Sequence, residues 1–491
     1  MSVTEQHGIG EVRGEQAEHL AAKIARVALA AGGRNLIITG LSALATAVVA
    51  RKLGAGSFGA YVSALATAQL AISFGDLGFS LVLGRDLAPD VEGRGLLLRT
   101  IVEVQFAWTL LLSVGVAVMG LLAGLGSARG ATLLIVSPAV AASAFAATRQ
   151  LYNAMFRIRL LVIVDLTVNL IQIAVTVALA LMHAPPPAIA AVFTLSLTTN
   201  SAVIAIAAFR STPARRPRLA ERWAIVRRAA PVGVASVLSS VYFTIDMVII
   251  PWLVSGPSVG RYGAACKVLS VLVTIPGLVV GAALPGLSLA GTDRANFSEL
   301  MARVEQWLAT VALPLCGFII VFADPITNLL FGSKYRAAAP LLQILAGAAA
   351  ASSLGNVFGT ALVSKSLVRT QVTCNALAMV LNVGGNIALV PHFGVAAAAW
   401  LTLATELFVI GWACIVLRHA VDLGRIASRL GRPALATAVL VSLGLAFRST
   451  LPVAVPLAVL GFIAVLTALR GWPEEFRLWR FRSPVSAGVQ G

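Results

Sequence analysis

Fourteen apolar blocks follow one another along the chain, and nearly all are long enough to cross a bilayer as helices. A spanning helix needs about 20 consecutive apolar residues. With 58% hydrophobic and 12% charged residues, the chain has far fewer charges than a soluble domain, which carries about 25%. The sequence therefore predicts an all-α polytopic membrane protein and excludes soluble, disordered and disulfide-rich classes.

Positive residues fall mainly on every second connection between these blocks. If the N-terminus is cytoplasmic, the inner segments carry 28 of the 37 Lys and Arg residues and the outer segments carry eight, with Arg34 inside the first block. Because Lys and Arg are enriched in cytoplasmic loops, both termini are expected in the cytoplasm. The net charge of +17 is then a topological signal. The basic residues form no stripe with interleaved aromatic residues, the pattern that would indicate binding of nucleic acid.

The chain contains a weak internal repeat. Gly59 and Tyr61 follow the first block as Gly260 and Tyr262 follow the seventh, at an offset of 201 residues. Transporters commonly bind substrate between such repeats. The predicted organisation has two pseudo-symmetric six-helix lobes and two added helices: a cytoplasmic tail (1–25), an N-lobe (26–209), a basic linker (210–229), a C-lobe (230–418), two C-terminal spans (432–470) and a second cytoplasmic tail (471–491).

The sequence contains no motif for catalysis, a metal or a cofactor in the structural context that such a motif requires. Gly54, Gly56 and Gly59 match G-x-G-x-x-G, but they lie in a short turn between two spanning helices rather than between a strand and a helix. No P-loop for nucleotide hydrolysis occurs, and the five histidines suggest no zinc site or triad. We therefore expect no catalytic residue, no metal and no cofactor.

Ionisable residues at bilayer depth are candidates for function, because burying each costs at least about 2.5–3.5 kcal/mol. Two acids lie centrally in their blocks, Asp246 and Glu406, and two more lie deep, Asp76 and Asp165. A carboxylate in such a place can bind and release an ion and so couple transport to a gradient. The alternative is structural: a hydrogen bond from Tyr242 to Asp246 or from Thr402 to Glu406, one turn earlier, or an ion pair of Asp246 with Lys267.

Three cations are candidates for binding an anionic headgroup in a central cavity: Arg34, Lys267 and Arg149. Arg34 lies about 12 Å into the first block, at 1.5 Å per residue. The alternative for Lys267 and Arg34 is that the side chain extends to the membrane interface.

The chain resembles the Wzx-type polysaccharide flippases of the MOP exporter superfamily over residues 25–420. The resemblance is carried by ARKLGAGSFGAYVSALATAQLAISFGDLGFSLVLGRDLA, IDMVIIPWLVSGPSVGRYGAACKV, FGSKYRAAAPLLQIL and NALAMVLNVGGNIALVPHFGVAAAAWLTLATE. Asp76, Arg85, Asp246, Tyr262 and Lys267 match positions typical of the family. Lipid II flippases share the fold, but a first helix with more charge than Arg34 is expected in them.

The resemblance implies two lobes around a cavity that opens alternately to either side of the bacterial inner membrane. It implies translocation of undecaprenyl-diphosphate-linked sugar units, with membrane lipids, a polysaccharide polymerase and chain-length or export proteins as partners. The alternatives are a multidrug or cation antiporter of the same superfamily, a lipid II flippase and, in a different class, a membrane glycosyltransferase or polymerase. The low aromatic content of 7% argues against the antiporter, and the lack of a long catalytic loop argues against the enzymes.

Overall fold

The computed structural model describes residues 3–86, 94–155, 157–212, 219–254, 256–289 and 293–473, with most side chains from position 37 onward. Within these ranges the chain is helical and contains no strand. The elements are α1 (Val3–Asp76), α2 (Phe79–Asp86), α3 (Arg94–Leu122), α4 (Ala128–Ala142), η1 (Ser143–Thr148), α5 (Arg149–Ala154), α6 (Ile158–Leu181), α7 (Pro186–Arg210), α8 (Leu219–Leu253), α9 (Pro257–Leu289), α10 (Arg294–Val321), α11 (Ala323–Phe331), η2 (Ser333–Ala338), α12 (Ala339–Ser364), α13 (Val368–Phe393), α14 (Val395–Leu417), α15 (Leu423–Ala446) and α16 (Leu451–Ala468).

Eleven helices of the described part are long and apolar enough to cross a membrane. This number is approximately consistent with the fourteen expected, given three features of the described helices. Gly54, at φ 72° and ψ 166°, interrupts α1 and divides its apolar part into two spans. The helices α8 and α9 contain 35 and 33 residues, which exceeds the length that a span requires.

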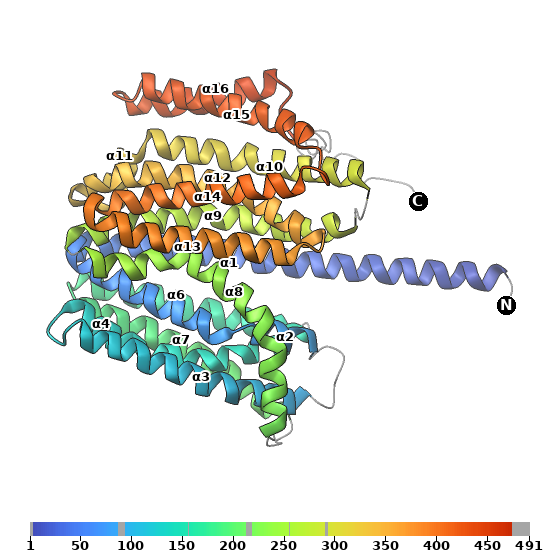
Figure 1. The fold of residues 1–491 in the computed structure, drawn as a ribbon, viewed down its shortest axis with the longest axis horizontal. Coiled ribbons are helices and arrows are strands. Elements are labelled where there is room, and N and C mark those ends of the chain that lie inside the picture. Colours follow the sequence, from blue (N-terminus) through green and yellow to red (C-terminus); the bar gives the residue numbers. More distant parts are fainter. Residues whose placement is uncertain are drawn as a thin grey trace, which may run out of the picture.

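The spans form two groups that lie side by side (Figure 1). One group, the N-lobe, contains α1, α3, α4, α6 and α7, and the other, the C-lobe, contains α8, α9, α10, α12, α13 and α14. The pair α15 and α16 lies outside both groups and packs on α10. We call the end of the bundle where α1 begins and α16 ends the proximal end, and the opposite end the distal end.

The two lobes meet along a seam in which α1 packs against α8 and α9. Near the distal end Gly59 faces Gly260, its partner in the repeat: a Cβ on Gly59 would lie 2.8 Å from the nitrogen of Gly260. Equivalent residues contact each other where a two-fold axis passes between two copies of one surface. The two glycines that correspond in the sequence repeat therefore lie together at the seam.

The proximal end of the seam is also closed. A Cβ on Gly233 of α8 would lie 2.1 Å from the carbonyl oxygen of Leu77, which follows α1. Gly78 has a φ of 76°, a backbone conformation that glycine adopts without strain. The lobes are thus in backbone contact at both ends.

Candidate functional site

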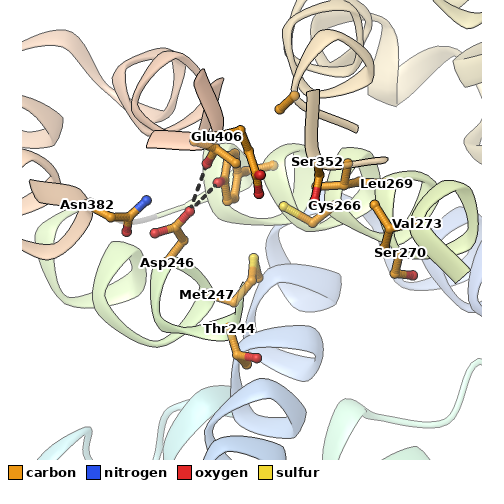
Figure 2. Close-up of a pocket in the computed structure, with 13 residues that line it drawn as sticks. Thr244, Asp246, Met247, Cys266, Leu269, Ser270, Val273, Ser352, Asn382 and Glu406 are labelled. Carbon is orange, nitrogen blue, oxygen red and sulfur yellow. Dashed lines mark hydrogen bonds between the residues drawn. The ribbon is translucent and has the colours of Figure 1, made fainter. Parts of the chain in front are cut away.

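A cavity of about 290 Å³ lies in the C-lobe, on the side that faces α1 (Figure 2). Its wall is built from five helices, α8, α9, α12, α13 and α14, so that residues distant in the sequence converge on it. We call it the central cavity. It is lined by Thr244, Asp246, Met247, Tyr262, Cys266, Leu269, Ser270, Val273, Ala348, Ser352, Asn382, Thr402 and Glu406.

Asp246 is the polar centre of this cavity and accepts hydrogen bonds from three other helices. The hydroxyl of Tyr262 donates to its Oδ2 at 2.9 Å, and the hydroxyl of Thr402 donates to the same oxygen at 3.1 Å. Nδ2 of Asn386 donates to Oδ1 at 2.9 Å. Uncharged donors therefore hold the carboxylate, and no ion pair joins it to Lys267, although both residues lie in the described part.

The amides beside Asp246 leave one acceptor unused. Nδ2 of Asn386 also donates to the side-chain oxygen of Asn382 at 3.0 Å, while Oδ1 of Asn386 is buried and has no hydrogen-bond partner. A carboxylate with amide and hydroxyl oxygens forms a set of hard oxygen ligands, the type that suits a small cation or a proton. In the described residues no three Asp, Glu, His or Cys side chains cluster, so the set carries little charge.

Glu406 of α14 is the second acid of the central cavity and is 6% exposed. This residue also has a hydrogen-bond or electrostatic partner and is therefore not free. The lining residues include these two acids and no Lys or Arg. The cavity is therefore acidic and is better suited to a cation than to a diphosphate.

Lys267 lies on α9 next to the lining residue Cys266, and its side chain is half-buried. It is one turn from Gly263, whose Cβ would lie 2.6 Å from the side chain of Val62 in α1. Residues at i and i+4 share one face of a helix. Lys267 therefore lies on the face of α9 that turns toward the N-lobe, at the edge of the central cavity.

Arg149 and Asp165 are bound to each other inside the N-lobe. The guanidinium donates from Nη1 to Oδ1 at 2.8 Å and from Nη2 to Oδ2 at 2.5 Å, and Asn200 donates to Oδ1 at 3.0 Å. The Asp165 side chain is 8% exposed and that of Arg149 26%. This bidentate pair connects α5, α6 and α7, so each charge is neutralised by the other.

The remaining candidates lie near the proximal end. Asp76 accepts hydrogen bonds from the backbone nitrogen and hydroxyl of Ser80, at 3.2 and 2.5 Å, and so caps the start of α2. Arg34 lies in α1 and Arg85 in α2, and the side chains of both are outside the described residues.

At the distal end, polar contacts reinforce the glycine seam. The Arg51 Nε donates to the carbonyl oxygen of Leu330 at 2.8 Å, and Nη2 donates to that of Leu329, so that α1 caps the C-terminus of α11. Tyr335 of η2 donates to the carbonyl oxygen of Ala50 at 3.0 Å. Arg129 of α4 donates to that of Pro251 at 2.8 Å. These contacts join the N-lobe to the C-lobe.

One buried acid was not among the sequence candidates. Glu305 of α10 is wholly buried, and neither carboxylate oxygen has a hydrogen-bond partner among the described residues. It lies in an apolar part of the C-lobe and does not line the central cavity. Its place at the start of an apolar block gave no signal in the sequence.

The two-lobe bundle, the seam closed at both ends and the polar cavity beside it define a membrane protein of transporter architecture. The structure resembles the lipid II flippase MurJ in an inward closed conformation, with a TM-score of 0.75 and 12% identity over 89% of this chain and 97% of that one. It also resembles the MATE multidrug transporter DinF-BH, with a TM-score of 0.59 and 10% identity over 81% and 95%. These likenesses confirm the expected fold class.

The sequence model of the family described as "Polysaccharide biosynthesis protein" matches residues 48–340. The chain therefore belongs to this family, which confirms the family that the sequence motifs indicated. It is 23% identical over 194 residues to the probable low-salt glycan biosynthesis flippase Agl15 of Haloferax volcanii, over 39% of this chain and 41% of that protein. It is 26% identical over 122 residues to the teichuronic acid biosynthesis protein TuaB of Bacillus subtilis, over 25% of each. The chain thus matches less than half the length of these curated relatives.

Proposed function

We propose that the protein translocates undecaprenyl-diphosphate-linked oligosaccharide units from the cytoplasmic to the periplasmic leaflet by alternating access. The units would serve the synthesis of a surface polysaccharide. The observation that carries the proposal is a two-lobe helical bundle with an inter-lobe seam along α1, in a chain of the polysaccharide biosynthesis family. The printed description of Agl15 as a glycan biosynthesis flippase supports the same activity.

The seam supports alternating access because its contacts are separable. Backbone contacts at glycines hold the lobes at both ends, between Gly59 and Gly260 distally and between Gly233 and the backbone of Leu77 proximally. Opening one end while the other stays closed would expose the space between the lobes to one side of the membrane. The division into an N-lobe (26–209), a linker (210–229), a C-lobe (230–418) and two added spans (432–470) belongs to this proposal.

Arg34 and Lys267 are the cations proposed to bind the diphosphate, with Arg149 as a third candidate. The position of Lys267 on the α9 face toward the N-lobe supports its role. Arg149 would need to exchange Asp165 for the substrate, which makes it the weakest of the three. A cation binds a diphosphate more strongly in a partly dry cavity than in water.

Asp246 is the residue proposed to couple transport to an ion gradient, followed by Glu406, with Asp165 and Asp76 after them. Its oxygen-rich, uncharged surroundings support binding of a proton or a small monovalent cation. Occupancy of this site can favour one arrangement of the lobes only if the ion binds the two arrangements with different affinity.

The proposed location is the bacterial inner membrane, with both termini in the cytoplasm and no enzymatic activity. The partners are membrane lipids, the lipid-linked substrate and the polymerase and chain-length or export proteins that receive it. Reporter fusions test the orientation: a periplasmic reporter after Pro186 should be active and one after Arg218 inactive.

Deletion of the gene tests the proposed activity in the cell. Lipid-linked oligosaccharide should accumulate in the cytoplasmic leaflet, where it is resistant to a glycan-cleaving enzyme added outside, and the polymer should be absent. A plasmid with the intact gene should restore both, and a plasmid with Lys267→Ala should restore neither. Normal export in the deletion strain would contradict the proposal.

A cation antiporter is the second candidate, and the acidic lining of the central cavity favours it. In that case the deletion strain would export polymer normally and become sensitive to cationic drugs. Both phenotypes can be measured on the same strain.

A further inference from the structure

Four basic residues lie at the distal end, on the two segments that meet where η2 packs on α1 near its kink. The hydrogen bond from Tyr335 to the carbonyl oxygen of Ala50, at 3.0 Å, fixes this contact. Tyr335 lies between two bases in the sequence, and Ala50 directly precedes two others. We call the four the distal cation cluster: Arg51, Lys52, Lys334 and Arg336.

All four residues of the distal cation cluster are exposed, and none has a carboxylate oxygen within 4.0 Å in the described part of the chain. Asp324 lies in the first turn of α11, and the other end of this helix contacts Arg51 through Leu330. Like charges on two segments in contact repel one another unless a counter-charge is present. The cluster is therefore an arrangement that an anion would stabilise.

The location of the cluster gives a second reason to expect a ligand. In the orientation of the proposed function, on which this inference rests, the distal end is periplasmic. Lys and Arg are depleted on that side of a membrane protein. Yet half of the eight positive residues predicted there lie in this cluster, two from each lobe.

An exposed apolar side chain lies next to Arg51. Arg51 donates to the carbonyl oxygen of Leu329, whose side chain is 73% exposed. A cation cluster beside an exposed leucine matches a molecule with an anionic headgroup and an acyl or prenyl chain, rather than a soluble anion.

We infer that the distal cation cluster binds the phosphate or diphosphate ester of a lipid at the periplasmic surface of the membrane. The planar guanidinium of Arg336 and the compact ammonium groups of Lys52 and Lys334 suit phosphate oxygens. The lipid is either the diphosphate lipid delivered by translocation or an anionic phospholipid of the bilayer. Because both lobes contribute charges, a bound phosphate bridges the seam and favours its closed arrangement.

The test measures lipid retention by the purified full-length protein with native mass spectrometry. The test variant is the triple substitution Lys52→Gln, Lys334→Gln and Arg336→Gln, which leaves Arg51 and its contact with α11 intact. The control is Arg448→Gln, an exposed base in the turn between α15 and α16 at the same end. The added lipids are undecaprenyl diphosphate, phosphatidylglycerol and phosphatidylcholine.

We expect the triple variant to retain at least one of the two anionic lipids about tenfold less than wild type. The Arg448→Gln protein and the retention of phosphatidylcholine should be unchanged. A loss confined to undecaprenyl diphosphate identifies the translocated lipid as the ligand, and a loss of phosphatidylglycerol identifies a bilayer phospholipid. The charge-preserving variant Lys52→Arg, Lys334→Arg and Arg336→Lys should retain lipids as wild type does.

Equal retention of both anionic lipids by wild type and the triple variant would overturn the inference, as would loss of retention in the charge-preserving variant with an unchanged melting temperature. Failure of the proposed function is a separate result. It would appear as an absence of translocation by the wild-type protein, whereas lipid retention is measured without transport.

Discussion

The substitution Gly260→Ala is expected to open the distal end of the seam. A Cβ at this position would lie 1.9 Å from the carbonyl oxygen of Ala55, which belongs to the rigid backbone of α1. A Cβ atom essentially never lies within 3.0 Å of another heavy atom, so α1 and α9 would have to move apart by roughly 1 Å. Overpacking of this kind costs about 1–3 kcal/mol. The closed distal arrangement would therefore lose a factor of roughly 5 to 150 in population relative to arrangements in which the helices are apart.

The native Cys266 provides the assay, because it lines the central cavity. In a protein whose other three cysteines are replaced by alanine, a membrane-impermeant thiol reagent added from the periplasmic side should modify Cys266 faster in Gly260→Ala than in wild type. Gly56→Ala is the matched control on α1, since a Cβ there meets no atom within 4 Å and the backbone conformation is an ordinary one. An unchanged rate in a folded Gly260→Ala protein, or the same increase in Gly56→Ala, would show that the contact of Gly260 with Ala55 does not control access to the cavity.

Three further substitutions test individual side chains. Asp246→Asn should change the free energy of unfolding by no more than about 1 kcal/mol, because the partners of Asp246 are uncharged. It should abolish the response of transport to an imposed proton or sodium gradient in proteoliposomes. An unaltered response would exclude Asp246 from coupling. Asp165→Asn should lower the free energy of unfolding by about 2–3 kcal/mol because it leaves the half-buried Arg149 without its carboxylate. The control Glu103→Gln, in an exposed pair with Arg222 at 2.7 Å, should cost less than about 1 kcal/mol. Similar costs for the two variants in thermal unfolding would contradict a structural role of the Arg149–Asp165 pair. Glu305→Met should stabilise the protein by about 1–3 kcal/mol because it removes an unpartnered buried carboxyl group. The neighbouring Gln306→Met should destabilise it because Gln306 donates to Gly471 at 2.9 Å and accepts from Arg429 at 3.1 Å. Destabilisation by Glu305→Met would show that the Glu305 carboxyl group has a stabilising partner.

The fold could be predicted from the sequence because its main signals are local. A block of apolar residues predicts each span, and the kink at Gly54 coincides with a turn expected from the sequence between two spans. The repeat was also visible, since Gly59 and Gly260 are needed where two backbones meet at the seam. These features depend on hydropathy and on the absence of a side chain, which can be read one segment at a time.

The polar site was only partly predictable, because its partners come from different helices. Asp246 was identified by its depth in the membrane, and hydrogen bonding was considered with Tyr242, one turn away. The side chain of Tyr242 lies outside the described residues, and the donors within them are Tyr262, Asn386 and Thr402, which the packing of α9, α13 and α14 brings to Asp246. Helical periodicity shows which residues share a face, but it does not show which face of another helix will lie opposite.

The same limit applies to the cations and to the ion pair of the N-lobe. Arg149 and Asp165 were separate candidates for binding substrate and an ion, and their separation of 16 residues gives no indication that they bind each other. Whether Lys267 faces the N-lobe likewise depends on the contact of Gly263 with Val62. Tertiary packing decides such questions.

Reconstitution of the purified protein tests the central proposal most directly. Proteoliposomes would contain an undecaprenyl-diphosphate-linked oligosaccharide in both leaflets, and an enzyme that cleaves the exposed glycan would be added outside. Without translocation only the outer pool, about half of the lipid, is cleaved. The wild-type protein is expected to make the whole pool accessible, and the Lys267→Ala protein is expected to leave the inner pool protected. Protection of the inner pool in wild-type proteoliposomes that contain folded protein, with and without an imposed ion gradient, would contradict the proposal.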